Sequence, residues 1–178
     1  MVQSLNYAYE HGQLSITQSD IKKRKDKSFL ENWRPLSLLN VDCKIVTKAI
    51  AHKISKVLPT IVKEDQTGYV QGRYIGQNIT LITDIVKVTE PESIPGLAIF
   101  IDFKKAFDTV DWNFLFRTLQ AFTFGPCIQK WIRTFYTNCS SCFINNGFAS
   151  EFFKLERGVR QGCPLSGSLF VLCAEIFS

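Results

Sequence analysis

The sequence predicts a mixed α/β fold, and three patterns carry that prediction. An apolar run at residues 97–101, bounded by Gly96 and Asp102, has the pattern of a central strand buried on both faces. Residues 145–147 read Asn-Asn-Gly between two apolar segments, which predicts a β-hairpin. Apolar residues at helical spacing over residues 42–58 predict a long amphipathic helix.

The composition is that of one globular domain. The chain has 178 residues, of which 46% are hydrophobic and 21% charged, so it can form a sizeable core and is not disordered throughout. Its six cysteines show no disulfide framework and its N-terminus no signal-peptide pattern, so we expect an intracellular protein. Charges interrupt every apolar run before the roughly 18 residues that cross a bilayer, so we expect no membrane association.

The helices of the first half follow from apolar periodicity and its interruptions. The first is expected to begin with Asp42 as its N-cap and to stop at Pro59. Residues 66–73 contain two glycines and predict a loop. A second helix is expected through residues 79–86, ending before Pro91.

The second half is expected to contain three helices and the hairpin. Asp111 caps the first of these helices, Gly125 and Pro126 begin the next, and Pro164 is the expected first residue of the last. The hairpin strands are expected around residues 142–144 and 148–155. No internal repeat or low-complexity linker divides the chain.

Most of the positive charge lies in one short segment. The formal net charge is +5, and residues 22–27 alone contribute +4. A compact basic segment beside a nearly neutral domain is suited to a phosphate backbone, although a solvated loop with incidental lysines has the same composition. We expect residues 1–28 to be poorly structured. The basic residues of the segment are Lys22, Lys23, Arg24, Lys25 and Lys27.

Asp102 is the strongest candidate for chemistry. A carboxylate at the carboxyl end of a buried strand points into the crevice where α/β folds bind ligands. Magnesium suits such a site, because it is usually held by one or two carboxylates together with substrate phosphates. The alternative is that Asp102 only caps the turn after the strand. Asp108 and Asp111 are expected to cap the following turn and helix.

Two further segments have the composition of anion-binding sites. Residues 157–166 contain two arginines and two glycines directly before a predicted helix, whose free amides favour an anion or a nucleic-acid backbone. An ordinary loop-to-helix junction has a similar sequence. Arg34 follows Trp33 and could hold a phosphate or stack on a base. Cys139 and Cys142 have zinc-like spacing without a second ligand pair, so we expect them to be structural.

In this order, the segments resemble the successive blocks of a reverse transcriptase, in the version found in non-LTR (long interspersed element type) retrotransposons. Group II intron maturases share the layout and rank second. The resemblance runs from about Phe29 to the last residue and implies fingers at about 29–96 and part of a palm at about 97–178. The blocks lie at residues 32–45, 65–69, 72–73, 100–108 and 160–166.

The resemblance also implies roles for single residues. Asp102 matches a metal-binding aspartate, with the backbone carbonyl of Phe103 beside the same metal. Phe107 matches the aromatic residue that excludes a ribose 2′-hydroxyl. Gln161 and Gly162 match the block that contacts the incoming nucleotide and the template.

Basic residues are implied to contact phosphates. Arg34 matches an arginine near the triphosphate, and Lys27 is a second candidate for that contact. Arg73 either touches the template or forms a structural salt bridge. Lys22, Lys23, Arg24, Lys25 and Arg160 are further candidates for nucleic-acid contacts. The implied partners are an RNA template, a DNA primer and deoxynucleotide triphosphates, with two Mg²⁺ ions as cofactors.

The sequence departs from the family pattern in three places, of which the change at Gly167 and Ser168 is the mildest and is expected to be tolerated. The expected aromatic-x-Asp-Asp block is not found, and the chain contains no Asp-Asp pair. An apolar strand ending in Pro-Lys is not found before the basic segment, and Gly167 and Ser168 stand where the family usually has a proline. We therefore expect a fragment that is inactive alone. The alternatives are a degenerate, non-catalytic remnant and an unrelated nucleic-acid-binding module.

Overall fold

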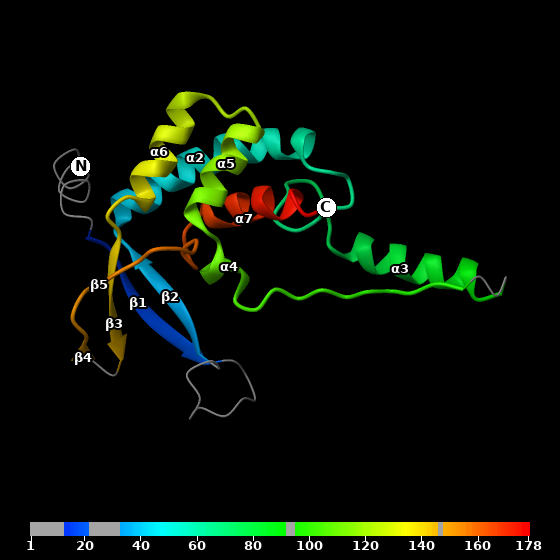
Figure 1. Cartoon of the computed structure of the whole chain (residues 1–178), viewed down its shortest axis with the longest axis horizontal. Coiled ribbons are helices and arrows are strands. Elements are labelled where there is room, and N and C mark those ends of the chain that lie inside the picture. The colour runs from blue at the N-terminus through cyan, green and yellow to red at the C-terminus, as the bar shows by residue number, and fades with distance from the viewer. Residues whose placement is uncertain (1–12, 22–32, 92–94, 146–147) are drawn as a thin grey trace.

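The molecule consists of a helical body, a five-stranded sheet and a helix that projects from the body (Figure 1). The computed structural model describes residues 13–21, 33–91, 95–145 and 148–178, and it describes side chains from residue 37 onward, that of Asn145 excepted. This mixture of helix and sheet confirms the predicted α/β class. The helices are α2 Val41–Ile61, α3 Gly76–Thr89, α4 Ala106–Thr109, α5 Trp112–Ala121, α6 Pro126–Tyr136 and α7 Ser166–Glu175.

The sheet joins the start of the chain to its second half. Its strand order is β2-β1-β3-β4, with β5 also paired to β3. β1 pairs antiparallel with β2 and parallel with β3, so residues far apart in sequence share a ladder. Sequence analysis assigned no strand to β1. The strands are β1 Gln13–Ile21, β2 Trp33–Leu39, β3 Ser140–Asn145, β4 Phe148–Ala149 and β5 Phe153–Lys154.

The predicted hairpin is confirmed. β3 and β4 pair antiparallel, with Ile144 opposite Ala149 and Asn145 opposite Phe148. The turn residues 146 and 147 lie outside the described residues. β5 extends the second arm of the hairpin and returns the chain toward the body.

The core of the body lies among α2, α5, α6 and α7. α7 packs against α5 and α2, and α5 packs against α6. α7 itself is buried on most sides, because six of its ten residues are buried. The side chains with no solvent exposure are Leu58, Leu115, Leu119, Ile132, Leu169 and Leu172.

Three predicted helix ends are wrong by one or two residues. α2 has Asn40 at its N-cap position. Asp42 instead lies in the first turn, where the helix dipole stabilises a carboxylate. Pro59 does not stop α2, which continues to Ile61, because a proline in the last turn removes only its own N–H from the ladder. α7 begins at Ser166, two residues after Pro164.

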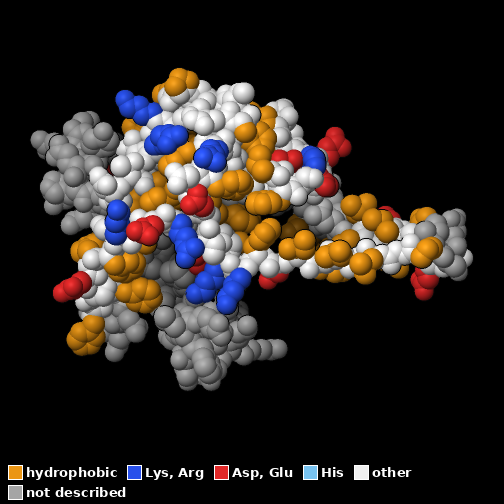
Figure 2. Space-filling view, in the orientation of Figure 1, with side chains coloured by type: hydrophobic (Ala, Val, Ile, Leu, Met, Phe, Trp, Pro, Cys, Tyr) orange, Lys and Arg blue, Asp and Glu red, His pale blue; other side chains and the backbone are white. Residues whose placement is uncertain are grey.

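α3 and the segment that follows it form an arm, defined here as residues 76–91 and 95–103. α3 has no buried residue, although its apolar residues recur at helical spacing. Hydrophobic side chains are visible along the arm in Figure 2.

The predicted central strand at residues 97–101 is wrong. These residues form no strand, and Leu97, Ile99 and Ile101 are 72–85% exposed. A strand requires a hydrogen-bonded neighbour, and none of the described strands pairs with this segment. No helix in the described residues is long and apolar enough to span a membrane.

Candidate active site

Two of the segments singled out in the sequence are joined by a network of hydrogen bonds. The backbone N–H of Gly158 donates to the carbonyl of Val110 at 2.8 Å, and that of Val159 donates to the carbonyl of Phe107 at 2.7 Å. The indole N–H of Trp112 donates to the carbonyl of Gly158 at 2.9 Å. The loop before α7 is therefore held against the turn formed by α4.

Glycine is required at position 158 for two reasons. Its φ of +93° lies in the left-handed region, which side chains rarely adopt. A Cβ atom there would also lie 3.0 Å from the carbonyl oxygen of Asp108. The close approach of the two segments thus depends on the absence of a side chain.

Gln161 connects this junction to a third segment. Its side-chain amide donates to Oδ1 of Asp108 at 3.1 Å, and its backbone carbonyl accepts from the N–H of Ser37 at 3.0 Å. Gly162, with φ +96°, leaves room for the carbonyl of Ser37, which a Cβ would approach to 3.2 Å. Ser37, Asp108 and Gln161 line the same hollow of about 420 Å³.

Phe107 is held by aromatic side chains from two elements. Its ring stacks on Phe170 of α7, with ring centroids 4.9 Å apart, and meets the edge of Tyr69 at 5.9 Å. Gly167 accommodates Tyr69, because a Cβ at that position would lie 2.7 Å from the Tyr69 ring. Phe107 is half-buried, so part of its ring remains accessible beside the junction.

Asp102 lies outside this junction. It is exposed at the end of the extended segment of the arm, and in the described part of the chain it forms no hydrogen bond with Asp108 or Gln161. No group of three His, Cys, Asp or Glu residues among the described residues could hold a metal ion. Asp102 alone is therefore not a complete site for a divalent ion, although it can contribute one carboxylate ligand.

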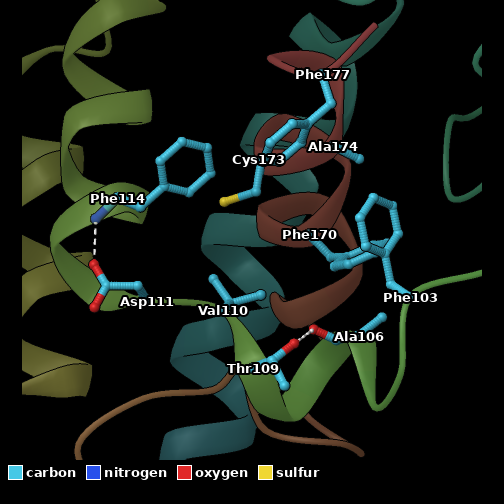
Figure 3. A pocket seen from close by; sticks show the side chains of 10 residues that line it. All are labelled: Phe103, Ala106, Thr109, Val110, Asp111, Phe114, Phe170, Cys173, Ala174 and Phe177. Carbon is cyan, nitrogen blue, oxygen red and sulfur yellow. Dashed lines mark hydrogen bonds between the residues drawn. The ribbon is translucent and has the colours of Figure 1, made fainter.

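The side chain of Phe103 enters an apolar hollow of about 250 Å³ (Figure 3). Its ring lies 6.1 Å from that of Phe177, and Phe114 and Phe170 line the same hollow. Asp111 at the rim caps α5 as predicted, accepting from the N–H of Phe114 at 2.8 Å. The ring of Phe103, although 52% exposed, thus contacts the helical body, whereas Asp102 lies in solvent.

Arg160 is a core residue, in contrast to the prediction that it contacts nucleic acid. Only 7% of it is exposed, and its guanidinium donates to the carbonyl of Phe135 at 2.8 Å and to Sγ of Cys139 at 2.9 Å. The guanidinium also lies over the Tyr136 ring, 5.4 Å from its centroid. A side chain so enclosed cannot reach a phosphate backbone.

Burial also raises the pKa values of the groups around Arg160. Desolvation raises the pKa of the Cys43 thiol to about 11, although the charge of Arg160 opposes the rise. The pKa values of Cys139 and Tyr136 are raised for the same reason. Cys139 and Cys142 are free and buried, which agrees with the structural role predicted for them.

Arg73 closes the end of α2. Its guanidinium donates to the carbonyls of Pro59 at 3.0 Å, Val62 at 3.2 Å and Gln66 at 2.8 Å, and also to that of Lys63. These bonds tie the end of α2 to the loop that follows it, and the carbonyl of Pro59 is one that the helix end leaves without a partner in the helix. The bonds are to backbone carbonyls and not to a carboxylate, in contrast to the predicted salt bridge, while the template contact stays a prediction.

The remaining predicted basic contacts are only partly described. Arg34 lies in β2 opposite Asp20, and its side chain is not described. The basic segment, with Lys22, Lys23, Arg24, Lys25 and Lys27, lies outside the described residues.

Sequence reasoning did not anticipate three contributors to the junction. Asp108 had been expected only to cap a turn, whereas it accepts from Gln161. Tyr69 and Phe170 both contact Phe107. The signal that could have identified Tyr69 is its place in the block at residues 65–69. Phe170 cannot be distinguished in sequence from a core residue of α7.

Comparison with known proteins gives the family. Residues 21–178 match the model of the family described as reverse transcriptase (RNA-dependent DNA polymerase). The chain is 37% identical over 178 residues to the transposon TX1 uncharacterized 149 kDa protein of Xenopus laevis, a match that covers 97% of this chain and 14% of the relative.

Weaker matches are to retrotransposon proteins. The Pol polyprotein from the type-2 retrotransposable element R2DM of Drosophila melanogaster is 23% identical, over 82% of this chain and 14% of the relative. The Pol polyprotein from the type-1 retrotransposable element R2 of Nasonia vitripennis is 27% identical, over 78% of this chain and 13% of the relative. The chain spans about one seventh of the length of these relatives. The resemblance to non-LTR retrotransposon proteins predicted this result. Because the family model covers most of the chain, the chain belongs to the reverse transcriptase family.

Proposed function

We propose that this chain supplies part of the nucleotide-binding centre of an RNA-directed DNA polymerase of a non-LTR retrotransposon. The observation that carries the proposal is the junction in which Gln161 bonds to Asp108 and to the backbone of Ser37. It brings together three segments that resemble separate blocks of the family. A nucleotide bound there would contact Gln161 and Gly162, with the partly accessible Phe107 ring beside it.

The residues of the junction have distinct proposed roles. The bond from the side-chain amide of Gln161 to Asp108 restricts the rotamers of Gln161, so that less entropy is lost when it contacts a nucleotide. Phe107 is clamped between Tyr69 and Phe170 and excludes a ribose 2′-hydroxyl by its bulk. Arg34 and Lys27 approach the triphosphate in this proposal, and the segment at residues 22–25 approaches the template.

A pair of Mg²⁺ ions would supply charge stabilisation to the transferred phosphoryl group. Asp102 is the proposed carboxylate ligand, with the Phe103 carbonyl beside it. The described residues do not form a complete ligand set, so the remaining carboxylates would have to come from outside them. The proposed partners are an RNA template, a DNA primer and deoxynucleotide triphosphates. We expect no primer extension by the 178-residue chain alone.

Photo-crosslinking with an azido-deoxynucleotide, in the presence of an RNA template annealed to a DNA primer, tests the proposal. Labelling should fall several-fold in Gln161→Ala and stay unchanged in Gln120→Ala, an exposed glutamine of α5. In Phe107→Val, a ribonucleotide should compete better with the label than it does in the unmodified chain. Equal labelling of Gln161→Ala and Gln120→Ala would refute the proposed site.

A further inference from the structure

The helical pair α5–α6 lies in a region of the sequence without carboxylates. Residues 112–150, a stretch of 39, contain Arg117, Lys130 and Arg133 but no Asp or Glu. The 16 acidic residues in the 178 of the chain would place three or four in a stretch of that length at random. These three cations therefore have no acidic neighbours in sequence to neutralise them.

Packing directs the cations outward. Leu115 and Leu119 of α5 and Ile132 of α6 have no solvent exposure and face the core. Arg117, Lys130 and Arg133 are exposed. Figure 2 shows Lys and Arg side chains over α5 and α6 in the upper part of the view.

A groove of about 500 Å³ runs along the outer face of α6. Its lining includes Lys130 and Arg133 and contains no carboxylate. The two residues are three apart on the helix, which places their Cβ atoms about 5–6 Å from each other. The groove shares no lining residue with the hollow beside Gln161.

Arg133 is held in place by packing. Its guanidinium lies over the Phe116 ring of α5, 4.2 Å from the ring centroid. The ring covers one face of the guanidinium and leaves its N–H groups at the edge free to donate. Because the side chain is already ordered, binding an anion costs little additional conformational entropy.

The cations of the groove are also unpaired. Neither Lys130 nor Arg133 forms an ion pair with a described residue. The hydroxyls of Thr134 and Thr137, which line the groove, donate to the carbonyls of Lys130 and Arg133 within α6. The charged donors of the groove are therefore Lys130 and Arg133, which suits a ligand with successive negative charges.

We propose that the groove on α6 binds the phosphate backbone of a nucleic acid, with Lys130 and Arg133 contacting phosphates and Arg117 extending the basic surface. The inference rests on the proposed function only in its choice of ligand, because a protein that uses a template and a primer meets phosphodiester chains. It adds a contact surface separate from the nucleotide junction. Phosphate contacts of this kind position a nucleic acid without reading its sequence.

The test is the salt dependence of binding to a short fluorescein-labelled RNA–DNA hybrid, measured by anisotropy with the full 178-residue chain. Each phosphate contact contributes about one unit to the slope of log K against log salt. Lys130→Gln/Arg133→Gln should lower the slope by roughly two units. The matched control is Lys53→Gln/Lys56→Gln, an exposed pair with the same spacing and charge on α2, which should leave the slope nearly unchanged.

Two further variants keep the outcome interpretable. Lys130→Gln alone removes no ring contact, so it should fold normally and lower the slope by about one unit. In a chain in which Lys22, Lys23 and Lys25 are replaced by Gln, Lys130→Gln should still lower the slope by about one unit, because the proposal treats the groove and the basic segment as independent contacts. Nucleotide labelling that depends on Gln161 should persist in Lys130→Gln, which separates this proposal from the preceding one.

An unchanged slope in the double variant overturns the proposal. Equal losses in the double variant and in its α2 control also overturn it, since net charge alone would then explain binding. The double variant could also lose binding to a labelled poly-glutamate peptide while its binding to the hybrid is unaffected. That result would assign the groove to an acidic protein and overturn the proposal as well.

Discussion

The helical body and the arm contain similar apolar residues in similar periodic patterns, yet only the body buries them. α2 buries five residues at intervals of three or four, whereas α3 buries none. Ile54 of α2 is 1% exposed, while Ile79 and Ile82 of α3 are 68% and 44% exposed. An apolar stripe thus predicts that a helix forms, and packing against another element decides whether the stripe is buried.

The same difference separates the two segments that resemble catalytic blocks. Residues 157–166 are bonded to α4 and α5 and lead into the buried α7. Residues 97–102 have a more apolar sequence but no neighbouring strand among those described. The junction around Gln161 is therefore built by the body, and Asp102 belongs to the arm.

Hydrogen exchange should show the largest contrast between the two regions. Backbone amides of residues 97–101 have no ladder and should exchange at nearly unprotected rates, whereas amides in the middle of α7 should be protected roughly a thousandfold or more. Mass spectrometry of peptides from the labelled chain measures both in one sample. Protection of residues 97–101 comparable to that of α7 would mean that the arm is covered in solution.

A matched pair of substitutions should separate the regions in stability. Leu169→Ala in α7 removes a side chain with no exposure and should cost about 2–5 kcal/mol of unfolding free energy. Leu81→Ala in α3, where the leucine is 52% exposed, should change it by no more than about 0.5 kcal/mol. Urea denaturation followed by circular dichroism measures both, and similar losses would contradict the exposed position of α3.

A second pair compares two arginines of the same sequence block. Arg160→Gln removes the buried guanidinium that donates to the carbonyl of Phe135 and to Sγ of Cys139, and it should cost about 1–3 kcal/mol. Arg157→Gln alters an exposed side chain and should stay within about 0.5 kcal/mol. The same denaturation experiment applies. If Arg157→Gln were the more damaging change, the core position of Arg160 would be wrong.

Local sequence signals predicted most elements of the body. Asp111 caps α5, Pro126 begins α6 and the Asn-Gly hairpin forms, because caps, prolines and turn residues act within a few positions of the chain. Strand β1 was missed because its sequence is mostly polar, and it exists through pairing with β2 and β3. The domain boundaries at residues 28 and 96 remain predictions.

The candidate site was predictable in its blocks but not in its contacts. The order of the blocks indicated the family, and Gln161 and Phe107 do lie at the junction. The bond between Gln161 and Asp108 joins residues 53 positions apart, which no local pattern reveals. Arg157 and Arg160 look alike in sequence, and only burial distinguishes them.

The sequence by itself determined the family, the α/β class and the positions of most helices, since these depend on motif order, periodicity and capping. Only the tertiary structure decided that Arg160 and Arg73 serve the fold, that residues 97–101 form no strand and that Asp108 supports Gln161. The physical reason is the same in each case. A buried charge, a strand and a hydrogen-bonded glutamine all need partners from elsewhere in the chain, and those partners are brought close only when the chain is folded.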